Sequence, residues 1–576
     1  MKLVKFLKPY WFFALMTPLT MIGEVLIDLM LPTLMSKIVD EGVLGHDFEL
    51  IIKTGLMMLL LAVCGGICGV GSSAFSGATS HSFSRDLRNE AFAKVMDLSF
   101  QQTDKFTTGS LVTRMTTDIN LIQQFVDLVL RMFVRSFMMF AGGIIMMLRL
   151  NVDFGIVLLI ALPIELIFMF VIIAKASPIF KILQKKLDKV NSVVQENVSG
   201  ARVVKAYVRE DFETKRFSAA NDDLTGTALR VQKIMAVLGP VLSIVLNISV
   251  VAIIFIGGEQ IENAASEMKV GSVMAAITYI TQILHSITMV SMMFMSITRA
   301  KASAERINEI LDTEPAIKTG SKKIDSIGEI EFENVDFFYP GFEGKTVLSN
   351  LNLKIRKGEN IAILGSTGSG KTSLINLIAR FYDVSSGSLK IDGTDVREID
   401  LESLRDRISI VMQKTELFSG TVKSNLRWGN ENADEDELKT AAEIAEAHEF
   451  IENMPDKYDG YVAEKGASLS GGQKQRMSIA RSILKKPDVL IFDDSTSALD
   501  LSTEARLRRK LFEHMKGTTV ITIAQRIASI KNCDRIAVLD DGNLVAVGTH
   551  DELLENSEVY RDIYESQMKK GDVINA

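Results

Sequence analysis

Gly365-Ser-Thr-Gly-Ser-Gly-Lys-Thr372 matches the pattern G-x-x-x-x-G-K-[ST] at every position. The apolar run Ile361–Leu364 precedes it and the helix-patterned run Ser373–Phe381 follows it, which predicts a strand, a glycine-rich turn and a helix. In such an arrangement backbone N–H groups converge on phosphate oxygens, and the helix dipole adds positive potential. Lys371 then reaches the outer phosphates, and the Thr372 hydroxyl can ligate Mg²⁺. The stretch therefore predicts a nucleotide site.

The composition of the chain changes along its length. Its 576 residues are too many for one domain. Hydrophobic residues make up 47% of the chain, and nearly all the long apolar runs lie before residue 300. We therefore expect a membrane domain over residues 1–325 and a soluble domain over residues 326–576. The net charge of −7 gives no indication of a nucleic-acid partner. The three cysteines are too few and too badly spaced for a disulfide framework or a metal site.

Six apolar runs in the first domain are each about 20 residues or longer, enough to cross a hydrocarbon core of about 30 Å. They lie at about 11–35, 54–75, 125–148, 154–174, 234–257 and 270–295. The segments after the second and fourth runs are rich in Lys and Arg, whereas the turn 40–49 has neither and the turn 258–269 has one Lys. This asymmetry predicts a multi-pass protein of the cell membrane with both termini in the cytoplasm.

The two basic segments are long and helical in pattern. They are predicted to extend the membrane helices into the cytosol, and residues 103–118 and 200–212 at their ends are expected to dock on the soluble domain.

Three carboxylates lie inside predicted spans. Glu24 and Asp28 are four residues apart and share one helix face, and Glu165 lies in the fourth span. An ionised carboxylate that faces lipid is costly, so all three are expected to face the interior of the bundle or a wet cavity. One interpretation is a substrate cavity that binds amphipathic cations; the alternative is helix packing or hydration.

The soluble domain alternates short strands with helices. The predicted strands include several continuous apolar runs, which are typical of a sheet covered on both faces. They are Ile330–Phe337, Asn360–Leu364, Ile408–Met412, Val489–Phe492 and Thr518–Ile523. Asp392-Gly393 and Asp541-Gly542 are predicted hairpin turns. The fold class is therefore an α-helical membrane domain followed by an α/β P-loop nucleotide-binding domain.

The soluble domain resembles the ATP-binding cassette (ABC) family, and with the six spans the whole chain resembles an ABC exporter half-transporter. Besides the P-loop, Leu469-Ser-Gly-Gly-Gln473 is a full copy of the family signature, which in the family grips nucleotide held by the opposite cassette. Asp493 ends an apolar strand and matches the Mg²⁺-binding aspartate. Ser497-Ala-Leu-Asp500 matches the loop that crosses to the other cassette.

The resemblance implies ATP and Mg²⁺ as cofactors. It assigns to ATP Tyr339, whose ring would stack on adenine, Gly365, Ser366, Thr367, Gly368, Ser369, Gly370, Lys371, Thr372, Ser373 and Gln413. It assigns Thr372, Gln413 and Asp493 to Mg²⁺. It assigns Ser470, Gly471, Gly472 and Gln473 to the partner's nucleotide, and Asp500 to the cross-dimer loop.

Two positions depart from the family pattern. The residue after Asp493, usually the glutamate that polarises the attacking water, is Asp494, and the usual histidine is Gln525. Aspartate is shorter by one methylene, about 1.5 Å, and misplacement on that scale can cost about 10²-fold in rate. Glutamine carries no charge at neutral pH and so lacks the switch role of histidine. The pattern predicts a site that binds ATP and hydrolyses it poorly.

The chain has one P-loop and one signature, so the resemblance implies a dimer. It resembles the degenerate-site subunit of a heterodimeric bacterial multidrug exporter, which implies a second half-transporter as partner, contact with membrane lipids, and an amphipathic drug or lipid as cargo. The alternatives that remain open are a homodimeric exporter with Asp494 as base, a lipid or peptide exporter, and an ATP-gated membrane switch or channel.

Overall fold

The computed structural model describes residues 2–262, 268–342, 344–496 and 498–574. The chain forms two compact units, each considered by itself below. Unit 1 comprises residues 1–96 and 109–313, and unit 2 comprises residues 97–108 and 314–576. The units therefore divide at residue 313, and a short piece of the N-terminal half belongs to unit 2.

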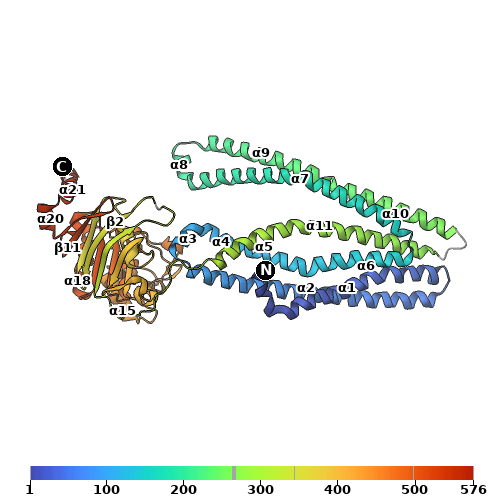
Figure 1. The fold of residues 1–576 in the computed structure, drawn as a ribbon, viewed down its shortest axis with the longest axis horizontal. Coiled ribbons are helices and arrows are strands. Elements are labelled where there is room, and N and C mark those ends of the chain that lie inside the picture. Colours follow the sequence, from blue (N-terminus) through green and yellow to red (C-terminus); the bar gives the residue numbers. More distant parts are fainter. Residues whose placement is uncertain (1, 263–267, 343, 497, 575–576) are drawn as a thin grey trace. The chain divides into compact units, whose positions relative to one another are not determined.

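The secondary structure of unit 1 consists of helices joined by short turns in the residues that the structure describes (Figure 1). Its elements are η1 (Lys2–Tyr10), α1 (Trp11–Lys37), η2 (Ile38–Val43), α2 (Phe48–Asp97), α4 (Thr108–Thr113), η3 (Arg114–Asp118), α5 (Ile119–Leu128), η4 (Val129–Phe133), α6 (Val134–Leu150), α7 (Phe154–Ser199), α8 (Ala201–Ala206), α9 (Glu210–Ala236), α10 (Leu238–Glu262) and α11 (Val270–Asp312). Here η1 is a 3₁₀-helix, and η2, η3 and η4 are short π-helical segments. η2 ends the first helical segment, whereas η3 lies between α4 and α5 and η4 between α5 and α6.

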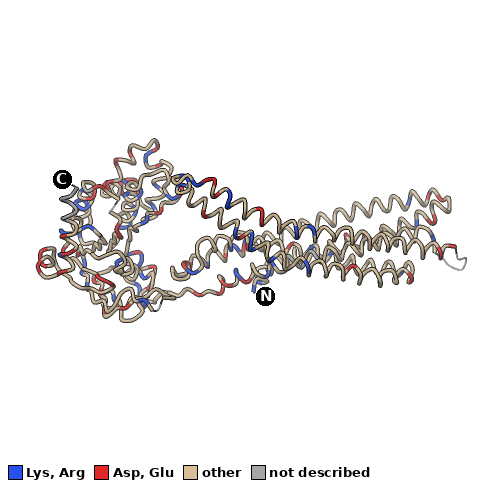
Figure 2. The backbone as a smooth tube through the Cα atoms, turned by 90° about the horizontal axis from the view of Figure 1, so that it is seen from above, with Lys and Arg blue, Asp and Glu red and all other residues tan. Residues whose placement is uncertain are grey.

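Among the described residues of unit 1, six helical segments are long and apolar enough to cross a membrane, which confirms the predicted number. Most run well beyond the predicted spans; the segment through α2, for example, extends over Phe48–Asp97. Figure 2 shows long stretches of these helices with few charged residues, and charges of both signs on the rest. On α2 the apolar side chains of Leu59, Val63 and Ile67 are exposed. Such a surface is suited to contact with lipid tails.

The core of unit 1 lies where α1, α6, α7, α10 and α11 pack together. Tyr279 of α11 is fully buried there. Its hydroxyl donates to the backbone oxygen of Leu29 at 2.6 Å and also contacts the Thr33 hydroxyl at 2.7 Å. A buried phenol needs a hydrogen-bond partner, so this contact fixes the facing positions of α1 and α11.

Unit 2 contains two main sheets. The larger has the strand order β12-β11-β3-β10-β9-β6, parallel except for the edge strand β12, and the smaller has the antiparallel order β2-β1-β4-β5. The strands are β1 (Glu329–Phe337), β2 (Leu348–Arg356), β3 (Asn360–Gly365), β4 (Ser386–Ile391), β5 (Thr394–Asp395), β6 (Ile408–Val411), β7 (Gly420–Thr421), β8 (Tyr461–Val462), β9 (Val489–Asp493), β10 (Thr519–Ile523), β11 (Arg535–Asp540) and β12 (Asn543–Gly548). All five predicted strands are confirmed.

The helices of unit 2 cover these sheets (Figure 1). They are α3 (Phe100–Phe106), α12 (Lys371–Ile378), η5 (Val396–Glu398), α13 (Leu401–Arg407), α14 (Val422–Leu426), α15 (Glu435–Ile444), α16 (His448–Glu452), η6 (Lys457–Asp459), η7 (Glu464–Gly466), α17 (Gly471–Leu484), α18 (Leu501–His514), α19 (Ile527–Ile530), α20 (His550–Asn556) and α21 (Glu558–Ile574). Both predicted hairpin turns are confirmed: Asp392-Gly393 joins β4 to β5, and Asp541-Gly542 joins β11 to β12, with positive φ at all four residues.

The helix α3 comes from the loop between the second and third spans, yet it packs within unit 2. The centroid of the Phe100 ring lies 4.6 Å from that of the Phe381 ring. The Asp104 carboxylate accepts a hydrogen bond from the Tyr382 hydroxyl at 3.0 Å. Burial chiefly raises the pKa of Tyr382, and this hydrogen bond adds to the shift. The docked segment is residues 97–108, shorter and earlier than the predicted 103–118, because Gly109 onwards belongs to unit 1. The docking of residues 200–212 stays a prediction.

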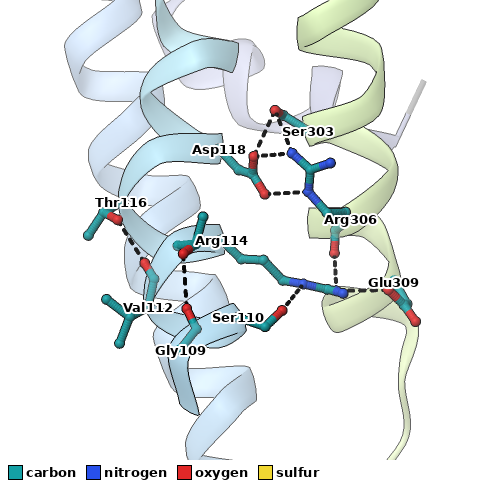
Figure 3. Close-up of polar contacts among 10 residues, drawn as sticks. Gly109, Ser110, Val112, Arg114, Thr116, Asp118, Ser303, Arg306 and Glu309 are labelled. Atoms are coloured by element: carbon teal, nitrogen blue, oxygen red, sulfur yellow. Dashed lines mark hydrogen bonds and ion pairs between the residues drawn. The ribbon is translucent and has the colours of Figure 1, made fainter. Parts of the chain in front are cut away.

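A polar cluster in unit 1 joins η3 to α11 (Figure 3). The Asp118 carboxylate is 1% exposed; it accepts hydrogen bonds from Arg306 Nε at 2.7 Å and from Ser303 Oγ at 2.8 Å. Nearby, Arg114 Nη1 donates to Glu309 Oε2 at 2.8 Å. A buried carboxylate is tolerated only when it is paired, so this cluster requires Asp118 and Arg306 to stay together.

Replacing Asp118 by Ala should therefore lower the thermal stability of the full chain in detergent. Hydrogen bonds to charged groups contribute about 1.5–3 kcal/mol each, and the lower end applies because Arg306 is half exposed. The control is Glu309→Gln, which removes a more exposed ion pair. Equal shifts of the melting temperature for the two variants would contradict the importance of the buried carboxylate.

Candidate nucleotide site

The site lies where the parallel strands of the larger sheet end. Because β3, β10, β9 and β6 run in the same direction, their carboxyl ends lie at one edge. The strand pairing places Ile523 beside Asp493, and the backbone N–H of Asp494 donates to the Ile523 oxygen at 3.1 Å. Ligands of parallel α/β sheets bind at this edge.

The glycine-rich loop follows β3 and leads into α12, as predicted. Gly368 and Gly370 have φ of +90° and +95°, which favours glycine at both positions. A Cβ on Gly370 would also lie 2.8 Å from the Val347 backbone oxygen. Lys371 is buried, and its Nζ donates to the backbone oxygens of Gly365 at 2.9 Å and Ser366 at 2.6 Å. Burial lowers the pKa of Lys371, which an anionic phosphate would counteract.

The residues assigned to Mg²⁺ fit that ion. The Thr372 hydroxyl donates to the Asp493 carboxylate at 3.1 Å, so the two predicted ligands meet. Burial chiefly raises the pKa of Asp493, with the Asp494 charge adding to the shift. A cation there would stabilise both carboxylates. A hydroxyl, a carboxylate and the Gln413 amide oxygen are the hard oxygen donors that Mg²⁺ prefers, and Mg²⁺ would neutralise phosphate charge when bound.

The two atypical residues are in direct contact. Gln525 Nε2 donates to Asp494 Oδ2 at 2.9 Å, and Gln413 Nε2 approaches the same oxygen at 3.5 Å. Burial is the main cause that raises the pKa of Asp494. Asp494 also has a φ of +46°, an uncommon conformation for a residue other than glycine. The sequence predicted these two residues at one centre, and the structure brings them together.

Tyr339 is half buried in an aromatic cluster. Its ring centroid lies 5.0 Å from that of Phe337 and 5.2 Å from that of Tyr382, both edge-on. Its hydroxyl contacts the Ser373 hydroxyl at 2.9 Å, so the ring is tied to the first turn of α12. Adenine stacking on Tyr339 stays a prediction, and the cluster shows how the ring is held in place next to the loop.

The signature forms the start of α17. Ser470 is its N-cap: Ser470 Oγ accepts from the Gln473 backbone N–H at 3.3 Å, and Gln473 Oε1 accepts from the Ser470 backbone N–H at 2.9 Å. A Cβ on Gly471 would have no atom within 4 Å, whereas one on Gly472 would lie 3.4 Å from the Ala498 oxygen. Gly471 therefore faces open space at a helix N-terminus, the geometry of an anion site.

Asp500 has a structural role within the chain. It caps α18, accepting from the Thr503 backbone N–H at 2.9 Å and from the Ser502 hydroxyl at 2.6 Å. These hydrogen bonds lower the pKa of Asp500. Its role in a cross-dimer loop stays a prediction, and Ser497 of that loop lies outside the described residues.

The membrane carboxylates separate into two places. Glu24 and Asp28 line a cavity of about 710 Å³ between α1, α2 and the segment η4–α6, together with Arg131 and Arg135. Arg135 contacts both carboxylates, Asp28 Oδ2 at 3.0 Å from Nη2. Glu165 is not part of this lining; it is buried between α7 and α11, where Oε1 accepts from the Thr288 hydroxyl at 3.2 Å.

The sequence reasoning missed Arg135. Both it and Arg131 stand in the third apolar run, four residues apart, which is the same spacing as Glu24 and Asp28. Two charges of each sign at matching spacing in two spans are a signal of pairing. The expectation of a cation-binding cavity depended on uncompensated negative charge, whereas Arg135 pairs with both carboxylates and Arg131 brings the lining to two charges of each sign.

Comparison with known proteins agrees with this geometry. The family model of the ABC transporter transmembrane region matches residues 14–287, and the ABC transporter model matches residues 348–497. An uncharacterized ABC transporter ATP-binding protein, YfiB of Bacillus subtilis, is 39% identical over 98% of both chains. This chain belongs to the ABC transporter family.

Two further comparisons place this ABC transporter among the exporters. It is 34% identical to the ATP-dependent lipid A-core flippase of Syntrophus aciditrophicus, over 94% of this chain and 90% of the relative. Its fold is that of a bacterial Atm1-family ABC exporter with ATP bound, with a TM-score of 0.81 and 24% identity over 97% and 98% of the two chains. The chain is thus a half-transporter that dimerises and couples ATP hydrolysis to transport across a membrane.

Replacing Tyr339 by Ala should weaken ATP binding to this ABC transporter, by about 1–3 kcal/mol if the ring stacks on the base. Tyr339→Phe keeps the ring and removes the hydroxyl contact with Ser373, so the loss should be about 1 kcal/mol or less. The measurement is an ATP titration of the purified chain. Tyr461→Ala, at an exposed tyrosine, serves as the control. Unchanged affinity in Tyr339→Ala would rule out the stacking role.

Proposed function

We propose that this chain is the weakly hydrolysing subunit of a heterodimeric ABC exporter of amphipathic compounds. The observation that carries the proposal is the contact between Gln525 and Asp494, at 2.9 Å. At the catalytic centre of this chain, the carboxylate stands on aspartate, which is one methylene shorter than glutamate, and it accepts a hydrogen bond from the neutral amide of Gln525.

Two effects on Asp494 oppose each other. Its raised pKa makes it a stronger base, which favours proton acceptance. Its shorter side chain withdraws the carboxylate by about 1.5 Å, and Gln525 occupies an acceptor position on Oδ2. A misplacement of this size costs about 10²-fold, which exceeds the gain from a modest increase in basicity. Hydrolysis should therefore be slow, while the P-loop and Tyr339 retain ATP.

The signature of this chain should serve the partner's nucleotide. Ser470 and Gln473 cap α17 reciprocally. Gly471 faces open space, because a Cβ added to it would have no described atom of the chain within 4 Å. An anion at this helix N-terminus would be stabilised by the backbone N–H groups and the helix dipole. Since this chain has an intact signature, a partner with a complete base and histidine would form one competent site with it.

We place the protein in the cell membrane with both termini in the cytoplasm. The support is the concentration of Lys and Arg in the loops after the second and fourth spans. The cargo that we propose is an amphipathic drug or lipid. The cavity beside Arg135 combines polar and apolar walls, and a relative 34% identical is named a lipid A-core flippase.

The catalytic proposal is testable with this chain alone. In a dimer of two copies, each site combines the altered base and glutamine with an intact signature, so the purified chain in liposomes should hydrolyse ATP slowly. The double variant Asp494→Glu with Gln525→His restores the family residues at both sites. Its turnover should rise about 10²-fold, as measured by phosphate release. Adding Lys371→Ala to the double variant should abolish the gain.

The homodimeric alternative predicts the opposite pattern. If the wild-type chain is a fast ATPase and Asp494→Asn silences it, then Asp494 is a working base and the weak-site proposal is wrong.

The role of the signature in trans is tested by mixing two copies in the Asp494→Glu, Gln525→His background. One copy carries Gly471→Glu and the other carries Lys371→Ala. If the signature acts across the dimer, mixed dimers keep one complete site, so purified mixed dimers should hydrolyse ATP although each parent dimer is inactive. Loss of one transition-state donor costs about 10²–10³ in rate, and this is the difference in ATP hydrolysis that we expect between the mixed dimers and the Gly471→Glu parent dimer. Inactive mixed dimers would show that P-loop and signature act within one chain.

A further inference from the structure

The cavity between α1, α2 and the segment η4–α6 is lined by charged side chains, and not all of them form ion pairs. Its lining includes Glu24, Asp28, Arg131 and Arg135, two charges of each sign. Arg135 pairs with both carboxylates through Nη1 and Nη2. The only hydrogen bond of Arg131 among the described residues joins Nη1 to the neutral Ser73 hydroxyl, at 2.9 Å. The positive charge of Arg131 is therefore the one that lacks an acidic partner.

A lone guanidinium in a membrane span is costly, and it becomes less costly when an anion approaches. Arg131 retains four further N–H donors in a planar fork, the shape that binds carboxylate, sulfonate or phosphate with two parallel hydrogen bonds. A cationic ligand is disfavoured next to Arg131, because Arg131 would repel it and because both carboxylates are already engaged by Arg135. Arg131 is therefore the charged group of the lining that favours an acid.

The rest of the cavity is suited to an apolar body. Its remaining wall includes Met21, Ile27, Leu31, Val70 and Met132, and its volume of about 710 Å³ lies within the range of small-molecule pockets, about 300–1,000 Å³. The flexible thioethers can adapt to different shapes.

Glycines of α2 keep this space open. A Cβ on Gly69 would lie 2.9 Å from Glu24 Oε2, so glycine allows the ion-paired carboxylate to approach the helix. A Cβ on Gly66, which also lines the cavity, would meet no atom within 4 Å. A larger residue at Gly66 would therefore fill the cavity without a clash at its Cβ.

We infer that this cavity binds an amphipathic molecule through its acidic group, with Arg131 as the receiving cation and the apolar wall around the body of the ligand. The inference rests on the proposed export of amphipathic compounds and names the class that the site recognises. A phospholipid with an anionic head group and a non-lipid acidic amphiphile share this chemistry.

The test measures binding without ATP, so that its result does not depend on the hydrolytic competence of the chain or on its partner. Native mass spectrometry of the purified full-length chain gives the affinity for four probes: phosphatidylglycerol, taurocholate, phosphatidylcholine and a cationic trimethylammonium lipid. At least one acidic probe should bind more tightly than the neutral and the cationic lipid. Tight binding of phosphatidylglycerol alone identifies a lipid head group as the source, and tight binding of taurocholate extends the site to acids that are not lipids.

Two variants locate the binding. Arg131→Gln should weaken the acidic probe about tenfold or more, the loss typical of a hydrogen bond to a charged group, and Arg131→Lys should restore part of it. The control is Arg149→Gln, at an exposed arginine of α6 outside the cavity. Gly66→Leu should block binding, whereas Gly55→Leu, at a glycine of α2 that also has open space, should not. Melting temperatures confirm that each variant is folded.

The inference is overturned if acidic probes bind no more tightly than the others, or if Arg131→Gln and Arg149→Gln have the same effect. It is also overturned if Gly66→Leu leaves acid binding intact. The proposed export is tested separately from the binding site. A chain that binds the acid at Arg131 yet moves no amphiphile when ATP is hydrolysed would contradict the proposed export but not the binding inference.

Discussion

Parallel pairing of β3, β10 and β9 is the constraint on which the nucleotide site depends. It brings the ends of three strands to one edge, so that the P-loop, Asp493 and Gln525 meet although they are far apart in the chain. The strands are almost fully buried, which holds the register, because a slipped pairing would expose apolar side chains. The positions of the catalytic side chains therefore follow from packing beneath the site.

Burial has two different consequences at this edge. It raises the pKa values of buried Asp493 and half-buried Asp494 and lowers that of buried Lys371, so all three groups are less stable as ions than in water. Phosphate and Mg²⁺ would reverse this penalty, which is one physical reason for such a site to hold its ligands tightly. Asp494 differs from its neighbours because one of its carboxylate oxygens already accepts a hydrogen bond from the Gln525 amide.

The membrane unit handles buried charge by pairing within the chain. Asp118 is held by Arg306 and Ser303, and Glu24 and Asp28 are held by Arg135. A charge in a low-dielectric interior requires such a partner, so these pairs fix which helix faces meet. Arg131 and Glu165 are different, since the hydrogen-bond partner of each is a neutral hydroxyl. Of the two, Arg131 lines the cavity and Glu165 does not, and this place in the cavity is what marks Arg131 as a binding residue.

The sequence by itself determined the six spans, the five strands named from it, the glycine-rich loop and both hairpin turns. These features depend on local pattern: runs of apolar residues, their period, and glycines where φ must be positive. It also identified Asp494 and Gln525 as atypical, since each stands next to a motif. Only the tertiary structure decided that Gln525 donates to Asp494, that α3 packs within the nucleotide-binding unit, and that Arg135 pairs with Glu24 and Asp28. Each of these contacts joins residues from different helices or strands, and no local pattern determines which side chains meet when such elements pack.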